Sequence, residues 1–359
     1  MNWQAAVCQS ACRDQPWRSP SIGEKHMTLR YGLIGCGYVC QRHVDAIQAL
    51  DGAKLVAVCD AQRDRAEQVA GKAGVGRVFA DYRDLLALNE VDVVVNLLPT
   101  HLHRAVTAGA ARQGKHVFVE KPIANTVAEA REMVRACREA GVKLCVGHSH
   151  RYFPTMQEAR RIIAEGFLGD LNKIRVVNCS YTPTRGQALS WHWDPSISPG
   201  TLLDTGIHYV DDIRYLSGAE IEEVHALVRC SRPEDVRLPD DGVALMRLTN
   251  GATALWEVSD GQHTGKGKIS RGEGIEVYGT RGSLTASLGG ALTAFWVTPE
   301  GKEVIHEAKL SSSFPDIWRR LHGDFLKSIL DDSPPPIPGE EGLRNLEVLL
   351  AILEGGQRQ

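Results

Sequence analysis

The chain has 359 residues, of which 43% are hydrophobic and 24% charged, and its formal net charge is -3. This length is enough for two domains with separate cores. The small negative charge gives no reason to expect nucleic acid or an anionic membrane as a partner, and no apolar stretch approaches the length that spans a bilayer. The nine cysteines show no C-x-x-C spacing and mostly lie in apolar runs. They therefore predict small, reduced core residues of a cytoplasmic protein.

The first 26 residues differ from the rest of the chain. They contain a polar Pro/Ser stretch, show no clear periodicity and end just before Met27, which precedes the first apolar run. They lack the continuous apolar segment of a signal peptide. We interpret residues 1–26 as a poorly ordered extension or an over-called start, with a role in oligomer contacts as the alternative.

A glycine turn follows the first apolar run and organises the first half of the chain. The strand predicted at residues 31–34 ends in Gly-Cys-Gly, and apolar residues then recur at helical spacing between 43 and 50. Glycine lets the backbone approach a pyrophosphate, which binds the free N–H groups of a helix N-terminus. Cys40 is a small residue at the third position of the fingerprint. The pattern predicts a dinucleotide site at Gly35, Cys36, Gly37, Tyr38 and Val39.

An acidic residue ends the second predicted strand, residues 54–59. At this position a Rossmann fold binds the adenosine ribose hydroxyls, so Asp60 is expected to hold them. Its carboxylate would repel a 2′-phosphate, which favours NAD over NADP. Arg63 lies close enough in the sequence to weaken that preference.

Strands rich in Val and Leu then alternate with helices, which predicts a parallel sheet. Helices are expected at residues 62–73, 82–88, 101–113 and 127–140, and strands at 77–80, 91–98, 116–120 and 143–148. Residues 27–148 are therefore predicted to form an α/β Rossmann domain with a doubly wound parallel sheet.

The pattern changes after Arg151. Helices are expected at residues 155–165, 201–216, 317–330 and 341–353, and strands at 171–181, 221–230, 242–249, 252–259, 274–278 and 283–286. This order predicts an α+β domain over residues 149–359 with a large, mostly antiparallel open sheet. We expect this domain to bind substrate and to form oligomer contacts.

Two constellations could carry chemistry. Lys121 lies in a Glu-Lys-Pro tripeptide at the carboxyl end of a parallel strand, where ligands of open α/β sheets bind, and the proline restricts it to extended backbone. Asp204, His208 and Asp211 are spaced to share one helix face. A histidine beside a carboxylate is a usual proton acceptor near neutral pH. Gly206 inside that helix costs about 1 kcal/mol relative to Ala, so we expect a large group close to its backbone.

A third constellation follows the last strand of the first domain, at residues 147–152. Its two histidines, His148 and His150, have an H-x-H spacing, as do His101 and His103. No cluster of cysteines or acidic residues has the spacing to complete a zinc site, so no metal is predicted.

Together these residues resemble the glucose-fructose oxidoreductase / inositol dehydrogenase / MocA family of NAD(P)-dependent oxidoreductases, from about Met27 to Leu353. The resemblance implies that Lys121 lies at the reacting hydroxyl, that His208 is the proton acceptor and that Asp204 orients substrate and histidine. It implies cofactor contacts from Leu98, Pro99, Thr100, His103, Glu120 and Lys121, and substrate contacts from Lys121, His148, Arg151, Tyr152, Asp204 and His208.

Trp191 and Trp193 lie in the loop before the Asp204 helix. They could enclose a polyol ring, because Trp faces stack on sugar C–H surfaces, or they could fill an interdomain core. Both interpretations stay open.

The activity that the resemblance implies is hydride transfer between a secondary alcohol of a sugar, inositol or related cyclic polyol and nicotinamide, with His208 or Lys121 taking the hydroxyl proton. NAD is the expected cofactor, and a homodimer or homotetramer through the open sheet is the expected assembly. Two alternatives stay open: an NAD-dependent glycosidase or lyase that uses transient oxidation with no net redox change, and a non-catalytic nucleotide-binding regulator. The identity of the sugar, the direction of the reaction and the oligomeric state are not determined by the residues.

Overall fold

The computed structural model describes residues 28–181, 194, 197–198, 200–232, 238–262, 273–311 and 313–355. The expectations for residues 1–26 and for Trp191 and Trp193 lie outside these residues. Among the described residues, no helix is long and apolar enough to cross a membrane.

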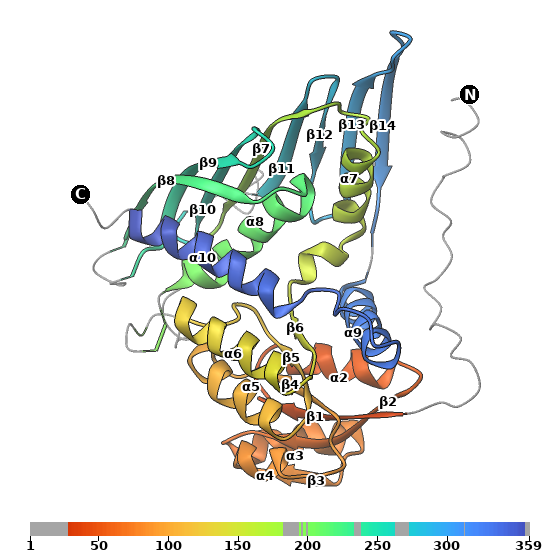
Figure 1. Cartoon of the computed structure of the whole chain (residues 1–359), viewed down its shortest axis with the longest axis vertical. Helices are drawn as coiled ribbons and strands as arrows, with labels where there is room; N and C mark the ends of the chain where they lie inside the picture. The colour runs from red at the N-terminus through yellow and green to blue at the C-terminus, as the bar shows by residue number, and fades with distance from the viewer. Residues whose placement is uncertain are drawn as a thin grey trace.

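The first half of the chain forms a parallel six-stranded sheet, in the order β3-β2-β1-β4-β5-β6. Residues 93–96 of the central strand β4 are all buried, because helices cover both faces of the sheet (Figure 1). The prediction of a doubly wound Rossmann domain is confirmed. The strands are β1 Leu29–Ile34, β2 Ala53–Cys59, β3 Arg77–Phe79, β4 Val93–Asn96, β5 His116–Val119 and β6 Leu144–Val146. The helices are α2 Cys40–Gln48, α3 Arg63–Ala73, α4 Tyr82–Leu86, η1 Thr100–Leu102, α5 His103–Arg112 and α6 Val127–Glu139.

The second half forms an eight-stranded sheet in the order β14-β13-β12-β11-β7-β10-β9-β8. Only the β7–β10 pair is parallel among the described strands of this sheet, so the prediction of a mostly antiparallel sheet is confirmed. The strands are β7 Leu171–Cys179, β8 Ile221–Arg229, β9 Asp241–Leu248, β10 Thr253–Ser259, β11 Glu273–Gly279, β12 Gly282–Ala286, β13 Ala291–Val297 and β14 Glu303–Lys309. The segments before and between them are η2 Ser149–Tyr152, α7 Pro154–Ala164 and α8 Thr201–Ser217.

The hairpin of β13 and β14 was not predicted. Its edge strand β14 reads Glu-Val-Ile-His-Glu-Ala-Lys, with Ile305 on the outward face and 70% exposed. An edge strand with polar residues on both faces lacks the clean apolar alternation of a half-buried strand. The sequence signal was therefore weak for β14, whereas β13, Ala-Leu-Thr-Ala-Phe-Trp-Val, has the alternation of a half-buried strand.

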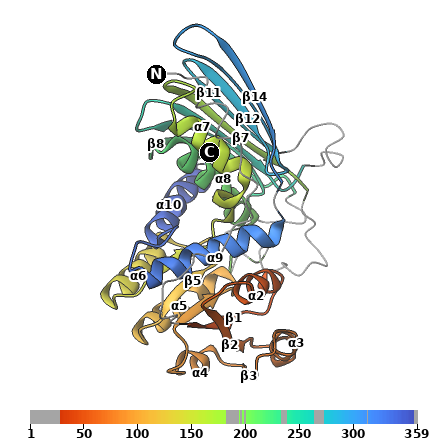
Figure 2. The same ribbon diagram turned by 90° about the vertical axis from the view of Figure 1, so that its right-hand side faces the viewer.

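Helices α7 and α8 lie on one face of the large sheet (Figure 2). On α8, a Cβ added to Gly206 would come within 2.6 Å of Trp256 Cζ2, and the indole N–H of this buried tryptophan donates a hydrogen bond to the Gly206 carbonyl at 3.2 Å. The expectation of a large group against the Gly206 backbone is confirmed. The group is Trp256, from the sheet below the helix.

The last two helices return to the first sheet. Helix α9, Phe314–Leu330, packs on α2, and α10, Gly339–Gly355, contacts both α6 and α8 (Figure 1). Between them, the carbonyl of Ile337 accepts a hydrogen bond from the Val146 N–H at 2.9 Å, beside the end of β6. The chain therefore crosses between the two sheets more than once. We keep residues 27–148 and 149–359 as proposed domains.

Candidate active site

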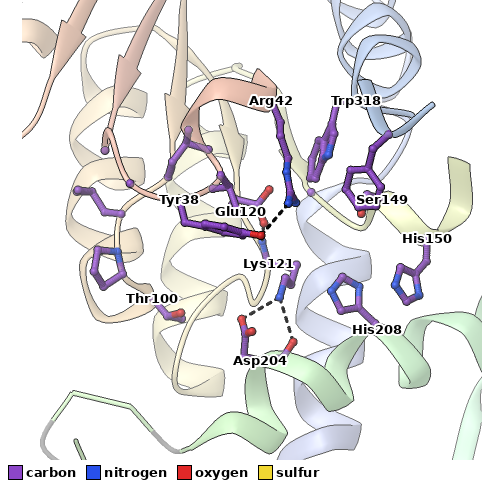
Figure 3. Close-up of a pocket in the computed structure, with 18 of the residues that line it drawn as sticks. Tyr38, Arg42, Thr100, Glu120, Lys121, Ser149, His150, Asp204, His208 and Trp318 are labelled. Carbon is purple, nitrogen blue, oxygen red and sulfur yellow. Dashed lines mark hydrogen bonds and ion pairs between the residues drawn. The ribbon is translucent and has the colours of Figure 1, made fainter. Parts of the chain in front are cut away.

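A cavity of about 930 Å³ lies at the carboxyl edge of the parallel sheet. Ends of β2, β5 and β6, the turn after β1 and the segment after β4 form one side, and α8, η2, α9 and the turn after β12 contribute the rest. Figure 3 shows how the polar side chains from these elements converge. The predicted residues that line the cavity are Gly35, Gly37, Tyr38, Val39, Asp60, Leu98, Pro99, Thr100, Glu120, Lys121, Asp204 and His208.

The glycine turn leaves room for a pyrophosphate at the start of α2. Gly35 has φ +103°, and an added Cβ would lie 2.8 Å from the carbonyl carbon of Leu97, so this glycine is required by the protein's own backbone. Gly37, in contrast, has no atom within 4 Å of an added Cβ. Helix α2 has no side-chain N-cap hydrogen bond and no acidic residue in its first turn. This helix N-terminus therefore fits an anion.

The Asp60 carboxylate accepts hydrogen bonds from backbone N–H groups, one of which belongs to the glycine turn. Its Oδ2 accepts a hydrogen bond from the Cys36 N–H and its Oδ1 from the Gln62 N–H, both at 2.8 Å. Cys36 is buried and is not among the lining residues, so its contribution is the backbone N–H. Arg63 forms an exposed ion pair with Glu67 outside the cavity. Arg65, which the sequence reasoning passed over, does line it.

His103 supports the cavity wall from outside the cavity. Its Nε2 lies 2.7 Å from the Leu98 carbonyl oxygen and its Nδ1 3.0 Å from the Pro122 carbonyl oxygen. Burial lowers the pKa of His103. The ring joins the segment after β4 to the segment after β5, and it does not itself reach the cavity.

Lys121 and Asp204 meet across the cavity from the two halves of the chain. The Lys121 Nζ lies 2.8 Å from Asp204 Oδ1 and 3.1 Å from the Asp204 carbonyl oxygen. Their side chains are 17% and 27% exposed, so the pair is open to a ligand. Figure 3 shows His208 beside this pair.

The His208 ring also lines the cavity. Its Nδ1 is buried and forms no hydrogen bond with any described residue. Burial, followed by the charges of His150, Lys121 and His148, holds the pKa of His208 well below its usual range. The ring is therefore neutral at physiological pH.

Glu120 is fixed by a chain of buried side chains. Its Oε1 lies 3.1 Å from His43 Nε2, and His43 Nδ1 lies 2.9 Å from His322 Nε2, which comes from α9. The Lys121 N–H donates to Glu120 Oε2 at 3.0 Å. The orientation of this carboxylate therefore depends on a residue about 200 positions later in the chain.

Three of the residues that were predicted to contact substrate do not line this cavity. The Arg151 guanidinium binds both oxygens of Asp211, with Nη2–Oδ1 at 2.6 Å, and also Glu341. His148 is fully buried, with Nε2 3.2 Å from the Asn345 amide nitrogen. The Tyr152 hydroxyl donates to Asp324 at 2.7 Å. These side chains bond to other residues of the protein, and none of the three lines the cavity.

Asp211 keeps the predicted helical spacing and still leaves the site. Burial raises the pKa of Asp211, but the nearby Arg151 and His148 outweigh it and hold that pKa well below its usual range. Asp211 lies about two turns beyond Asp204 on α8, and it is not among the lining residues.

Several lining residues were not found from the sequence. Some had a signal, because His150 belongs to the H-x-H pair that was considered only for zinc. Others come from α9 and from the β12–β13 turn, far along the chain and in no motif, and these are Leu288, Gly289, Phe314 and Trp318. Further lining residues come from α2, from the segments after β2 and β6 and from the start of β11, and these are Arg42, Gln62, Ser149, His150, Phe153 and Glu273. No group of three or more potential metal ligands occurs in the part of the chain that the structure describes.

Two family models match the chain. Residues 29–148 match the oxidoreductase family with an NAD-binding Rossmann fold, and residues 156–285 match the GFO/IDH/MocA C-terminal domain. The match to the first model agrees with the anion-ready helix and the fixed carboxylate of Asp60, and it identifies NAD as the cofactor.

Curated proteins and solved structures match nearly the whole chain. The scyllo-inositol 2-dehydrogenase (NAD(+)) of Bacillus subtilis is 30% identical over 335 residues, 90% of this chain and 92% of that protein. The 1,5-anhydro-D-fructose reductase of Ensifer adhaerens is 28% identical over 330 residues, 90% of this chain and 95% of that protein. The crystal structure of an NAD binding oxidoreductase from Klebsiella pneumoniae superimposes with a TM-score of 0.82 at 27% identity, covering 92% of this chain and 98% of that one. The chain is an oxidoreductase that belongs to the Gfo/Idh/MocA family.

Proposed function

We propose that this protein transfers a hydride between a secondary alcohol of a sugar, inositol or related cyclic polyol and NAD. The observation that carries the proposal is the Lys121–Asp204 pair, 2.8 Å apart, in the same cavity as the glycine turn and Asp60. Relatives named for inositol and anhydro-sugar substrates align over most of their length and support the substrate class.

Lys121, His208 and Asp204 have separate roles in the proposed reaction, which follow from their charges. NAD, when bound, supplies the redox chemistry by accepting the hydride from the alcohol carbon. The Lys121 ammonium, paired with Asp204, is placed to hold the hydroxyl oxygen and to stabilise negative charge on it. His208 lines the same cavity as Lys121 and Asp204 and is placed to accept the hydroxyl proton. Asp204 orients Lys121 through a hydrogen bond to its side chain, and it precedes His208 by one helical turn.

We propose that Asp60 selects NAD over NADP. Both of its oxygens are oriented by backbone N–H groups at 2.8 Å, so the carboxylate cannot turn away from a ribose at that position. A 2′-phosphate would meet its negative charge. Arg65 lines the same cavity and is the cation that could weaken this preference, a role that we earlier expected of Arg63.

The proposal is tested by a screen of cyclic polyols and sugars with NAD and NADP, followed by absorbance at the NADH wavelength. Accumulation of NADH with at least one polyol supports the proposal. Release of an aglycone from glycosides without NADH accumulation would instead identify the glycosidase or lyase alternative. NAD binding with no turnover of any compound would favour the non-catalytic regulator.

We also propose a homodimer or homotetramer formed through the open face of the large sheet. That face exposes apolar side chains on neighbouring strands, with Leu227 57%, Leu245 53% and Val243 46% exposed. Light scattering on the wild type and on the Leu245→Glu variant tests this, and a variant that keeps the wild-type mass would contradict it. The seven described cysteines are all free thiols, which supports our proposal of a cytoplasmic location.

A further inference from the structure

His150 adds a second imidazole to the cavity. It comes from η2, directly after β6, and it lines the cavity together with His208. The two rings lie nearly parallel, with centroids 4.1 Å apart and an interplanar angle of 13° (Figure 3). His208 in turn follows Asp204 by one turn of α8. His150 therefore lines the cavity next to His208.

The His150 ring is fixed in one orientation. Its Nδ1 lies 3.0 Å from Oδ2 of Asp212, a fully buried residue of α8. Phe153 and Tyr209 contact the ring edge to face, at centroid distances of 5.7 and 5.8 Å. The carboxylate occupies Nδ1, which leaves Nε2 as the ring nitrogen that can bond a ligand. A ring held on several sides is preorganised, unlike a surface histidine.

The two stacked histidines differ in the hydrogen-bond partner of their Nδ1 atoms. The Nδ1 of His208 is buried without a hydrogen-bond partner among the described residues, whereas the Nδ1 of His150 has a buried carboxylate. A carboxylate on one nitrogen sets the tautomer and increases the ability of the other to accept a hydrogen bond. His150 is thus built to bond a polar group.

We propose that His150, positioned by Asp212, recognises a second hydroxyl on the carbon next to the one that is oxidised. This inference rests on the proposed function and narrows its substrate class to vicinal diols of a polyol ring. A site that hydrogen-bonds a substrate hydroxyl rejects the analogue that lacks it, because its polar groups are left unpaired. His150 is then a specificity-determining residue, and Asp212 is a positioning residue that acts through it.

The test compares kcat/KM for a polyol substrate and for its two deoxy analogues, each lacking one hydroxyl next to the reacting carbon. For the wild type we expect one analogue to be slower by about 10²-fold or more. His150→Phe, which keeps the ring stack, should slow the polyol by a similar factor and leave that analogue nearly unchanged. Discrimination between the two compounds is thereby lost. His150→Gln, which can still bond a hydroxyl, should keep part of it.

Asp212 is tested by rescue. Asp212→Ala should lose discrimination as His150→Phe does, and Asp212→Asn should recover most of it, because the amide oxygen can still accept from Nδ1. Unchanged NAD affinity shows that each variant is folded. The matched control is His306→Phe, since His306 pairs with Glu158 of α7 at 3.0 Å, away from the cavity.

Two results would overturn the inference. His150→Phe could slow the polyol and both analogues equally, or it could leave discrimination as in the wild type. Calorimetric Kd values for the same compounds in the presence of NAD give a second readout that needs no turnover, and equal binding of polyol and analogues by the wild type would also overturn it. Failure of the proposed function differs from all of these, because the wild type would then form NADH from no polyol.

Discussion

Helix α8 carries two ionic clusters that contain similar residues but differ in burial. Near its start, Asp204 pairs with Lys121 at the cavity, and both side chains are partly exposed. Two turns later, Asp211 pairs with Arg151, and its carboxylate is fully buried. Arg214, on the next turn, binds Glu220 and Glu341. The first cluster lines the cavity, where a ligand can reach it, and the second is enclosed within the protein.

The difference shows that a charged pair can act on a ligand only if it is exposed to the cavity, and that its presence in the sequence alone is not enough. The Arg151–Asp211 pair has the stronger geometry, with three contacts to one carboxylate and a fourth to Glu341. It joins η2, α8 and α10, so it holds the helix that presents Asp204 and His208. We therefore expect changes in the open cluster to affect catalysis and changes in the buried cluster to affect stability.

The largest expected effect is on turnover at the open cluster. Lys121→Ala should lower kcat by ~10²–10⁴-fold, because a positioned group that assists proton transfer is typically worth that much. NAD affinity should change little, because the pyrophosphate is expected at the glycine turn. His208→Ala should behave similarly, and the double variant should lose less than the product of the two losses if both act on one proton path. Near-normal steady-state kinetics in both single variants would contradict the assignment.

At the buried cluster the expected effect is on stability. Arg151→Met should lower the free energy of unfolding by about 3–5 kcal/mol, because Asp211 is left as a buried charge without its cation. Urea denaturation measures this. Arg131→Ala, which removes the exposed pair with Glu347, is the control and should cost no more than about 1 kcal/mol. Comparable losses in the two variants would show that the buried cluster has no special role.

His148 makes the stability of the buried cluster depend on pH. Burial lowers its pKa to about 4, against an ordinary value of 6.5. Above pH 6.5 the ring is neutral in both the folded and the unfolded chain, so it costs nothing. As the pH falls from 6.5 to 4, the unfolded chain binds a proton that the folded one does not, and stability falls by up to about 3 kcal/mol.

The measurement is the free energy of unfolding from pH 7 to pH 4.5. His148→Asn should show a shallower decline than the wild type, whatever its stability at pH 7. An identical decline in His148→Asn would show that the ring titrates normally in the folded state.

The smallest expected effect is at the cofactor end of the cavity. Asp60→Ala should lower the ratio of the NADP dissociation constant to the NAD dissociation constant by about tenfold. The substitution removes both the ribose contact and the repulsion of a 2′-phosphate. Asp64→Ala, on the exposed side of α3, is the control. A wild-type preference for NADP would refute the role of Asp60 and direct attention to Arg65.

The sequence alone was enough for the fold class and for the half of the site that is local. Alternating apolar runs and helices predicted the Rossmann sheet, and the glycine turn, Asp60 and the Glu-Lys-Pro tripeptide follow its strands directly. Parallel strands end at one edge, so residues next to them in the chain must meet there. The same logic placed Lys121 correctly at the cavity, and helical spacing placed Asp204 and His208 on one face of α8.

Only the tertiary structure decided which polar residues remain free to act. Arg151, His148 and Tyr152 belong to a motif that predicted substrate contacts, yet Asp211, Asn345 and Asp324 bind them. In the reverse direction, His150 gained a buried carboxylate from Asp212 and became part of the cavity. A sequence shows which groups can bond, but their partners come from distant segments. Because a buried polar group must be paired, long-range packing decides which groups are used up inside the protein and which are left for a ligand.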